Sequence, residues 1–177
     1  LVQHHHFWLQ MFCFQTGFKK WIMIAHKLGA TGVRFDVSKT TEEDILDENN
    51  LNIISDKYGK LIDFSDELNI EIYFENHYGM TGDPDNVIKI LKRIPRIKYL
   101  FDSWNWNHKQ VSQAWIQCIP YADAVHIKTF YLNDKGEDAL INVKSLCEIL
   151  LSGGFQGCWT IETMPLGDDL ERPLIKG

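Results

Sequence analysis

The chain has 177 residues, 45% hydrophobic and 24% charged, which is the composition of an ordinary globular domain able to bury a core. Its formal net charge of −6, with no cluster of basic residues, argues against a nucleic-acid-binding surface. No apolar run approaches the ~20 residues of a membrane-spanning helix, and four widely spaced cysteines without a C-x-x-C pair favour a cytoplasmic protein with reduced thiols over a zinc knuckle or disulfide framework.

Residues 1–17 show no sustained helical or strand period, and we treat them as an atypical N-terminal segment. A frayed helix, a cloning remnant and a mistranslated end all remain open as interpretations of this segment. From residue 18 the pattern becomes regular, and residues 18–177 are predicted to form one domain.

In this domain, helical and strand patterns alternate. Apolar residues at helical spacing predict a first helix around Trp21 that ends at Gly29, and a short strand over 33–37 follows. A long helix is predicted from Glu42 to about Leu68, with Gly59 as a break. The remaining predicted elements are strands at 70–75, 97–102, 123–128 and 157–162, and helices at 84–94, 108–119 and 142–152.

Each of the last four predicted strands ends in or near a residue type that commonly binds metal: Glu75, Asp102, His126 and Glu162. Taken singly, each of them is as readily a cap or turn residue. Their intervals of 27, 24 and 36 residues (75 to 102, 102 to 126, 126 to 162) leave room for the βαβ pattern of a parallel sheet. If that sheet closes into a barrel, its strand C-termini meet at one rim, where one imidazole and three carboxylates suit a divalent cation.

The chain resembles the xylose isomerase-like TIM barrels at four motifs. They are Phe-Glu-Asn-His (74–77) followed by Asp83-Pro84, Phe-Asp-Ser-Trp-Asn (101–105), Tyr-Ala-Asp-Ala-Val-His-Ile-Lys (121–128) and Gly-x-x-Gly-x-Trp-Thr-Ile-Glu (154–162). The resemblance implies an α/β fold, a partial (β/α)8 TIM barrel comprising about strands four to eight with their helices. Strands one to three have no evident counterpart, so we expect a fragment of a longer gene product and leave its activity in isolation open.

The same resemblance implies a function, because this family includes sugar and sugar-phosphate isomerases and epimerases. By analogy Glu75, Asp102, His126 and Glu162 bind one divalent ion, which is manganese, magnesium, cobalt or zinc. Glu75 and Glu162 are then the catalytic pair of an isomerase of carbohydrate metabolism, which transfers a proton at a carbon next to a carbonyl. In the alternative, both glutamates are ligands only, and solvent or Lys128 handles the protons.

Three further residues are expected to contact the sugar. His77 either touches a substrate hydroxyl or caps the next turn. Lys128, two residues after His126 on the same strand face, either binds a substrate phosphate or carboxylate or pairs with Asp102. Asn105 stands beside two tryptophans that either line the barrel mouth or simply pack as a lid.

Two other functions are weighed against the isomerase. An endonuclease IV-like phosphodiesterase needs a three-zinc cluster, but Asn105 stands where its second histidine would be and residues 129–142 contain no histidine. The third hypothesis is a truncated barrel without catalytic activity. The expected partner is a small sugar or sugar phosphate, with no nucleic acid and no membrane, and a homo-oligomer is compatible with the sequence.

Overall fold

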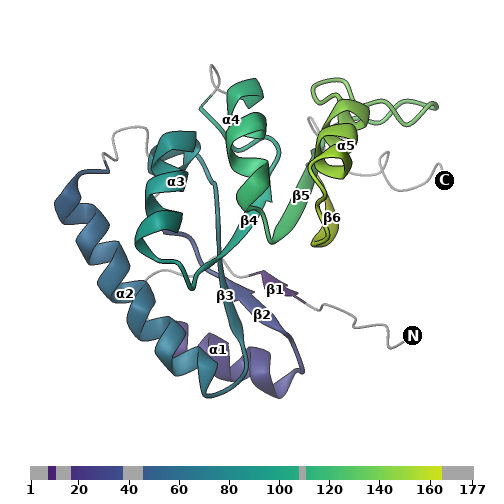
Figure 1. Cartoon of the computed structure of the whole chain (residues 1–177). Helices are drawn as coiled ribbons and strands as arrows, with labels where there is room; N and C mark the ends of the chain where they lie inside the picture. Colours follow the sequence, from purple (N-terminus) through teal and green to yellow (C-terminus); the bar gives the residue numbers. More distant parts are fainter. Residues whose placement is uncertain (1–7, 11–16, 38–45, 108–110, 165–177) are drawn as a thin grey trace.

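The computed structural model describes residues 8–10, 17–37, 46–107 and 111–164 (Figure 1). Its strands form one six-stranded sheet in chain order, and every pair of neighbours is parallel. The strands are β1 (Trp8–Gln10), β2 (Gly32–Arg34), β3 (Glu71–Glu75), β4 (Lys98–Asp102), β5 (Ala124–Thr129) and β6 (Cys158–Thr163). This confirms the predicted α/β fold, a partial (β/α)8 barrel.

A helix connects each strand to the next. The helices are α1 (Phe18–Lys27), α2 (Glu48–Asp66), α3 (Pro84–Arg93), α4 (Val111–Cys118) and α5 (Val143–Ser152), with short 3-10 turns η1 (Gly79–Gly82) and η2 (Ile119–Tyr121). They pack on the outer side of the strands, and the main hydrophobic core lies between the two layers (Figure 1). Among the described residues, no helix has the length and apolar character needed to cross a membrane.

Several details differ from the prediction, among them β2, which ends at Arg34 although the strand was predicted to run to residue 37. Strand β1 pairs with β2 at the edge of the sheet, although no regular element was predicted before residue 18. Helix α2 begins at Glu48, because the Asp47 side chain accepts a hydrogen bond from the Asn50 N–H and caps the helix there. The predicted helical residues 42–45 lie outside the described part of the chain. Gly59 does not break α2, whose neighbouring turns are held by the buried side chains of Tyr58 and Ile62.

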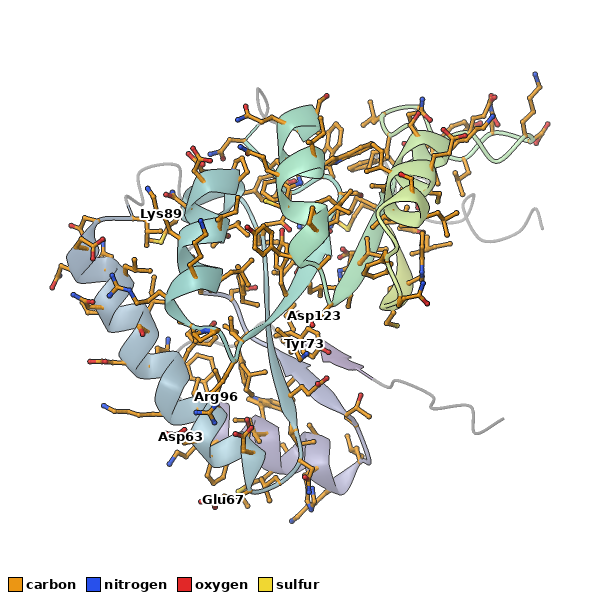
Figure 2. All side chains as sticks on the ribbon, viewed as in Figure 1. Asp63, Glu67, Tyr73, Lys89, Arg96 and Asp123 are labelled. Atoms are coloured by element: carbon orange, nitrogen blue, oxygen red, sulfur yellow. The ribbon has the colours of Figure 1, made fainter. Side chains whose placement is uncertain are left out.

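A cavity of about 600 Å³ lies between the N-terminal ends of β3 and β4 and the helices α2 and α3. Its charged side chains are already paired. Arg96 contacts Asp63 and Asp66 of α2, and Lys98 lies 2.9 Å from Asp123 (Figure 2). The Arg96 ion pairs link the segment before β4 to α2, and the Lys98 ion pair links β4 to the start of β5; all lie at the end opposite the strand C-termini.

The β5–α5 loop is organised by one carboxylate. Asp138 Oδ2 accepts hydrogen bonds from the backbone N–H groups of Phe130 and Tyr131, and Oδ1 accepts them from those of Leu140 and Ile141. Burial raises the pKa of Asp138, but these four hydrogen bonds outweigh it and hold the pKa below its usual value. The ionised carboxylate therefore ties the start of the loop to its end.

We expect the Asp138→Asn variant to expose two of the four loop amides to solvent, because an amide offers one acceptor oxygen where the carboxylate offers two. Losing charged hydrogen bonds of about 1–2 kcal/mol should speed their hydrogen exchange roughly 5- to 30-fold, as measured by NMR. Because the folded pKa is depressed, the parent loop should loosen only as the pH falls below about 4. Asp134→Asn, in the same loop, is the control, and equal protection in both variants would contradict the prediction.

Candidate metal centre

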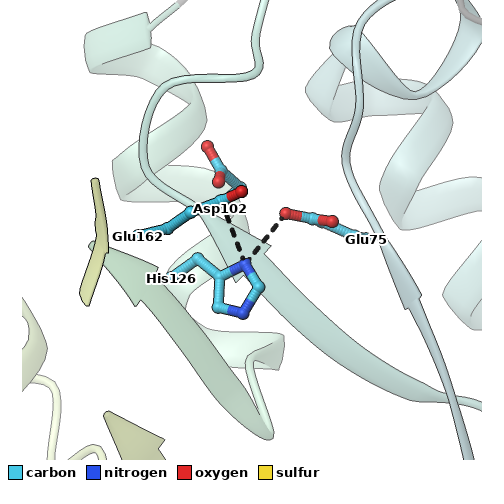
Figure 3. Close-up of side chains that lie close together, drawn as sticks. All are labelled: Glu75, Asp102, His126 and Glu162. Carbon is cyan, nitrogen blue, oxygen red and sulfur yellow. Dashed lines mark hydrogen bonds and ion pairs between the residues drawn. The ribbon is translucent and has the colours of Figure 1, made fainter. Parts of the chain in front are cut away.

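The four residues predicted as metal ligands meet at the C-terminal rim of the sheet. Glu75 and Asp102 are the last residues of β3 and β4, His126 lies in the middle of β5, and Glu162 is the second-last residue of β6. One potential ligand atom from each lies within 4.8 Å of the others. In Figure 3 the two glutamates approach from opposite sides, with His126 and Asp102 between them.

Alternation along the strands explains why these side chains share one face. Residues two apart in a strand point the same way. The residues two before Glu75 and Asp102 are Tyr73 and Leu100, which form a small second cluster with Ala124 on the inner face of the sheet. The ligand side chains therefore point to the same inner face as this apolar cluster and lie one layer closer to the C-terminal ends of the strands.

Asp102 is held so that only one of its oxygens faces the cluster. Oδ1 accepts hydrogen bonds from the backbone N–H groups of Trp104 and Asn105, at 2.8 and 2.9 Å. Oδ2 is buried without a hydrogen-bond partner among the described residues, and the Lys128 Nζ lies 3.2 Å from it. Burial raises the pKa of Asp102. A buried oxygen lacking a hydrogen bond is the arrangement expected of a metal ligand.

His126 joins the two glutamates. Its Nδ1 atom lies 3.1 Å from Glu75 Oε1 and 3.4 Å from Glu162 Oε2 (Figure 3). The hydrogen bond from His126, together with Lys128, holds the pKa of Glu162 well below its usual range, although partial burial acts in the opposite direction. Glu162 is therefore ionised at neutral pH, as a metal ligand must be.

Two buried cations offset part of this negative charge. The Arg34 guanidinium from β2 forms an ion pair with Glu75 and lies 3.5 Å from Asp36. Lys128 Nζ lies 2.7 Å from Glu162 Oε2 as well as beside Asp102. Burial lowers the pKa of Lys128, but the two carboxylates outweigh this and leave the pKa raised, so the side chain stays charged. The three ligand carboxylates and Asp36 carry four negative charges, and Arg34 and Lys128 carry two positive charges. The remaining charge of −2 is one that a divalent ion would balance. The donor set, the buried Asp102 Oδ2 and this net charge together fit such an ion.

Besides Lys128, the other two predicted substrate-binding residues, His77 and Asn105, also lie near the metal-ligand cluster. The backbone N–H of His77 donates to Thr81 Oγ1 at 2.9 Å, so the backbone caps the turn while the half-buried ring packs against Tyr78. Burial lowers the pKa of His77. Asn105 is buried, and its side-chain Nδ2 has no hydrogen-bond partner within the described ranges. Asn105 therefore carries a donor still available to a ligand.

The two tryptophans beside Asn105 have different roles. Trp106 is fully buried and packs against Phe101 with ring centroids 5.8 Å apart. Trp104 is partly exposed and meets Phe130 edge-on at 5.1 Å. Trp106 is therefore a core residue, and Trp104 with Phe130 joins the β4 and β5 loops.

Sequence reasoning did not assign two residues that hold the ligands in place. Arg34 received no predicted role, although it alternates with the apolar Val33 and Phe35 and so belongs to the inner face with Glu75. Asn76 was not singled out, although an asparagine between two expected site residues is a signal for a hydrogen-bonding role. It is fully buried and bonds to Asp102.

The model of the xylose isomerase-like TIM barrel family matches residues 14–174. No curated protein matches the sequence. Several solved structures share the fold at low sequence identity.

A D-allulose 3-epimerase from Methylomonas sp. is 15% identical, with a TM-score of 0.67 over 83% of this chain and 55% of that one. An L-ribulose 3-epimerase is 13% identical, with a TM-score of 0.69 over 83% of this chain and 52% of that one. A xylose isomerase-like TIM barrel protein from Mycobacterium smegmatis, in complex with magnesium, is 16% identical, with a TM-score of 0.61 over 82% and 58%. The chain spans little more than half the length of these structures, and the likeness establishes the fold alone.

Proposed function

The chain belongs to the xylose isomerase-like TIM barrel family, and from this we propose that it is a divalent-metal-dependent isomerase or epimerase of sugars or sugar phosphates. The observation that carries the proposal is the convergence of four potential ligand atoms within 4.8 Å. The solved structures of a D-allulose 3-epimerase and an L-ribulose 3-epimerase support the choice of ketose sugars as the first substrates to test.

Glu75, Asp102, His126 and Glu162 would hold one divalent cation. When bound, manganese, magnesium, cobalt or zinc supplies a Lewis acid that stabilises negative charge on the substrate oxygens. The mixed oxygen and nitrogen donor set is compatible with each of these metals.

Glu75 and Glu162 are the proposed proton carriers. They reach the centre from two different strands, β3 and β6, and lie on opposite sides of His126 and Asp102, so a substrate carbon between them would present one face to each carboxylate. One carboxylate removes the proton from the carbon next to the carbonyl, and the C–H electron pair moves toward the carbonyl oxygen. The other carboxylate, after taking up a proton from solvent, delivers it to the opposite face; the electron pair returns from oxygen to form the new C–H bond, which inverts that carbon.

Three residues are proposed to position the sugar. The buried Asn105 Nδ2, which lacks a hydrogen-bond partner among the described residues, would donate to a substrate oxygen. The His77 ring, whose pKa is lowered by burial, would accept or donate as a neutral imidazole. Lys128 keeps Asp102 and Glu162 oriented and would reach a substrate anion only by exchanging one of these contacts.

Mn²⁺ titration and turnover in deuterated water test the proposal. The chain should bind Mn²⁺ in a 1:1 ratio, reversibly by chelation, as followed by electron paramagnetic resonance. With Mn²⁺ and a panel of ketohexoses, pentuloses and their phosphates, NMR should detect solvent deuterium at the inverted carbon. Failure to bind Mn²⁺ would overturn the metal-dependent function. Isomerisation without deuterium uptake would indicate a hydride shift and remove the two-glutamate scheme, while the isomerase class would stand.

A further inference from the structure

Asn76 follows Glu75 at the end of β3, and its side chain bonds to Asp102 of the neighbouring strand β4. It is fully buried. Its Nδ2 donates to the backbone carbonyl of Asp102 at 2.9 Å, and its Oδ1 accepts from the Asp102 N–H at 2.8 Å. The same Oδ1 accepts from the Tyr99 hydroxyl at 2.8 Å. These three hydrogen bonds are called the Asn76 clasp.

The clasp replaces a missing part of the β-ladder. The paired residues of β3 and β4 end at Glu75 and Leu100, two residues before Asp102. Toward β5, Asp102 pairs with His126, so that side of its backbone is held by the sheet. Toward β3, the Asn76 amide takes the place of a backbone peptide group by offering one donor and one acceptor to Asp102.

The network also fixes the orientation of the amide. Oδ1 receives two donors and Nδ2 faces a carbonyl, so a reversed amide would set NH₂ against the Asp102 N–H. An aspartate at position 76 would lose the donor, and an alanine would lose both groups. Among these residues, only asparagine supplies the complete clasp.

We propose that Asn76 is a positioning residue of the metal centre, which fixes Asp102 Oδ2 relative to the Glu75 carboxylate on the neighbouring strand. The inference rests on the proposed function, because it assigns Asn76 to the same cation site. The pairing of β3 with β4 ends at Glu75 and Leu100, before Asp102 is reached. The clasp therefore sets the distance between the backbone of Asp102 and the end of β3. Hydrogen-bonded partners of metal ligands commonly govern metal affinity in this way.

The test compares Mn²⁺ affinity with thermal stability in the full 177-residue chain. Asn76→Ala should weaken Mn²⁺ binding roughly 10- to 100-fold, measured from the six-line paramagnetic resonance signal of free Mn²⁺. Tyr99→Phe removes one bond of the clasp and should weaken binding less, in the same direction. Ser65→Ala is the matched control. It removes a fully buried hydroxyl that donates to the Ile62 carbonyl in α2, and it should lower the melting temperature without changing Mn²⁺ affinity.

The outcomes separate the inference from the proposed function. If the unmodified chain does not bind Mn²⁺, the metal site fails and the clasp fails with it. If the unmodified chain and folded Asn76→Ala bind Mn²⁺ with affinities within twofold, only the clasp is overturned. If Asn76→Ala does not fold, Tyr99→Phe decides. If Tyr99→Phe has a lowered melting temperature, as expected for Ser65→Ala, but an unchanged Mn²⁺ affinity, the inference is overturned. Weakened Mn²⁺ binding by Tyr99→Phe would support it.

Discussion

Replacing Glu162 with Gln should lower turnover by at least ~10²–10⁴-fold, the usual contribution of an acid–base group, while much of the metal affinity remains. Glutamine preserves the shape and one coordinating oxygen but cannot accept the proton. Glu75→Gln should have the same catalytic effect, with a larger loss of stability, because it replaces the carboxylate of the buried ion pair with Arg34 by a neutral amide. Turnover and bound Mn²⁺ are measured on the same samples.

Glu67→Gln provides the control for both glutamate variants. Glu67 follows α2 and lies at the end of the sheet opposite the centre (Figure 2), so its replacement should change neither quantity. Turnover within about threefold of the parent in Glu162→Gln would exclude Glu162 as a proton carrier and favour a role as ligand only.

Replacing Arg34 with Met should destabilise the fold by about 3–5 kcal/mol, because it leaves the Glu75 carboxylate buried without a counter-charge. Denaturation in urea measures this free energy of unfolding. The double variant Arg34→Met/Glu75→Gln should recover most of the loss. Added Mn²⁺ should stabilise Arg34→Met more than the parent, because the cation would supply the missing positive charge.

Arg93→Met is the matched control for Arg34→Met. Arg93 pairs with Glu48, and these side chains are 37% and 80% exposed. Such a pair contributes less than about 1 kcal/mol because solvent screens it. Equal losses of stability in Arg93→Met and Arg34→Met would show that burial does not distinguish the two pairs.

The sequence predicted the features that depend on regular periods. Five strands and their helices follow from alternation and helical spacing, and parallel strands bring their C-terminal ends to one rim, so Glu75 and Glu162 could be grouped although 87 residues separate them (75 to 162). Strand β1 has only three residues and lies in the segment 1–17 that shows no sustained period, whereas the equally short β2 lies within an apolar stretch after a predicted helix. The start of α2 depends on Asp47 acting as its N-cap, and the sequence alone does not distinguish Asp47 from other polar residues nearby that are also suited to cap a helix.

Contacts between strands could not be predicted in the same way. Arg34 reaches Glu75 from β2, and the Asn76 amide reaches Asp102 on β4. Both depend on how far neighbouring strand ends are separated, which no local pattern in the sequence encodes. Lys128 was predicted to pair with Asp102 as one alternative, but its second contact, with Glu162, required the register of β5 against β6.

The two internal cations also bear on the order in which the molecule is assembled. Each ligand carboxylate already touches a positive group, Arg34 beside Glu75 and Lys128 beside the other two. The newly made chain can therefore close this part of the sheet before any cation arrives. On the proposed function, metal uptake is then an exchange of partners at a finished site, in contrast to small zinc domains that are unfolded without metal. A protein built in this order can gain, lose or replace its ion and keep its shape.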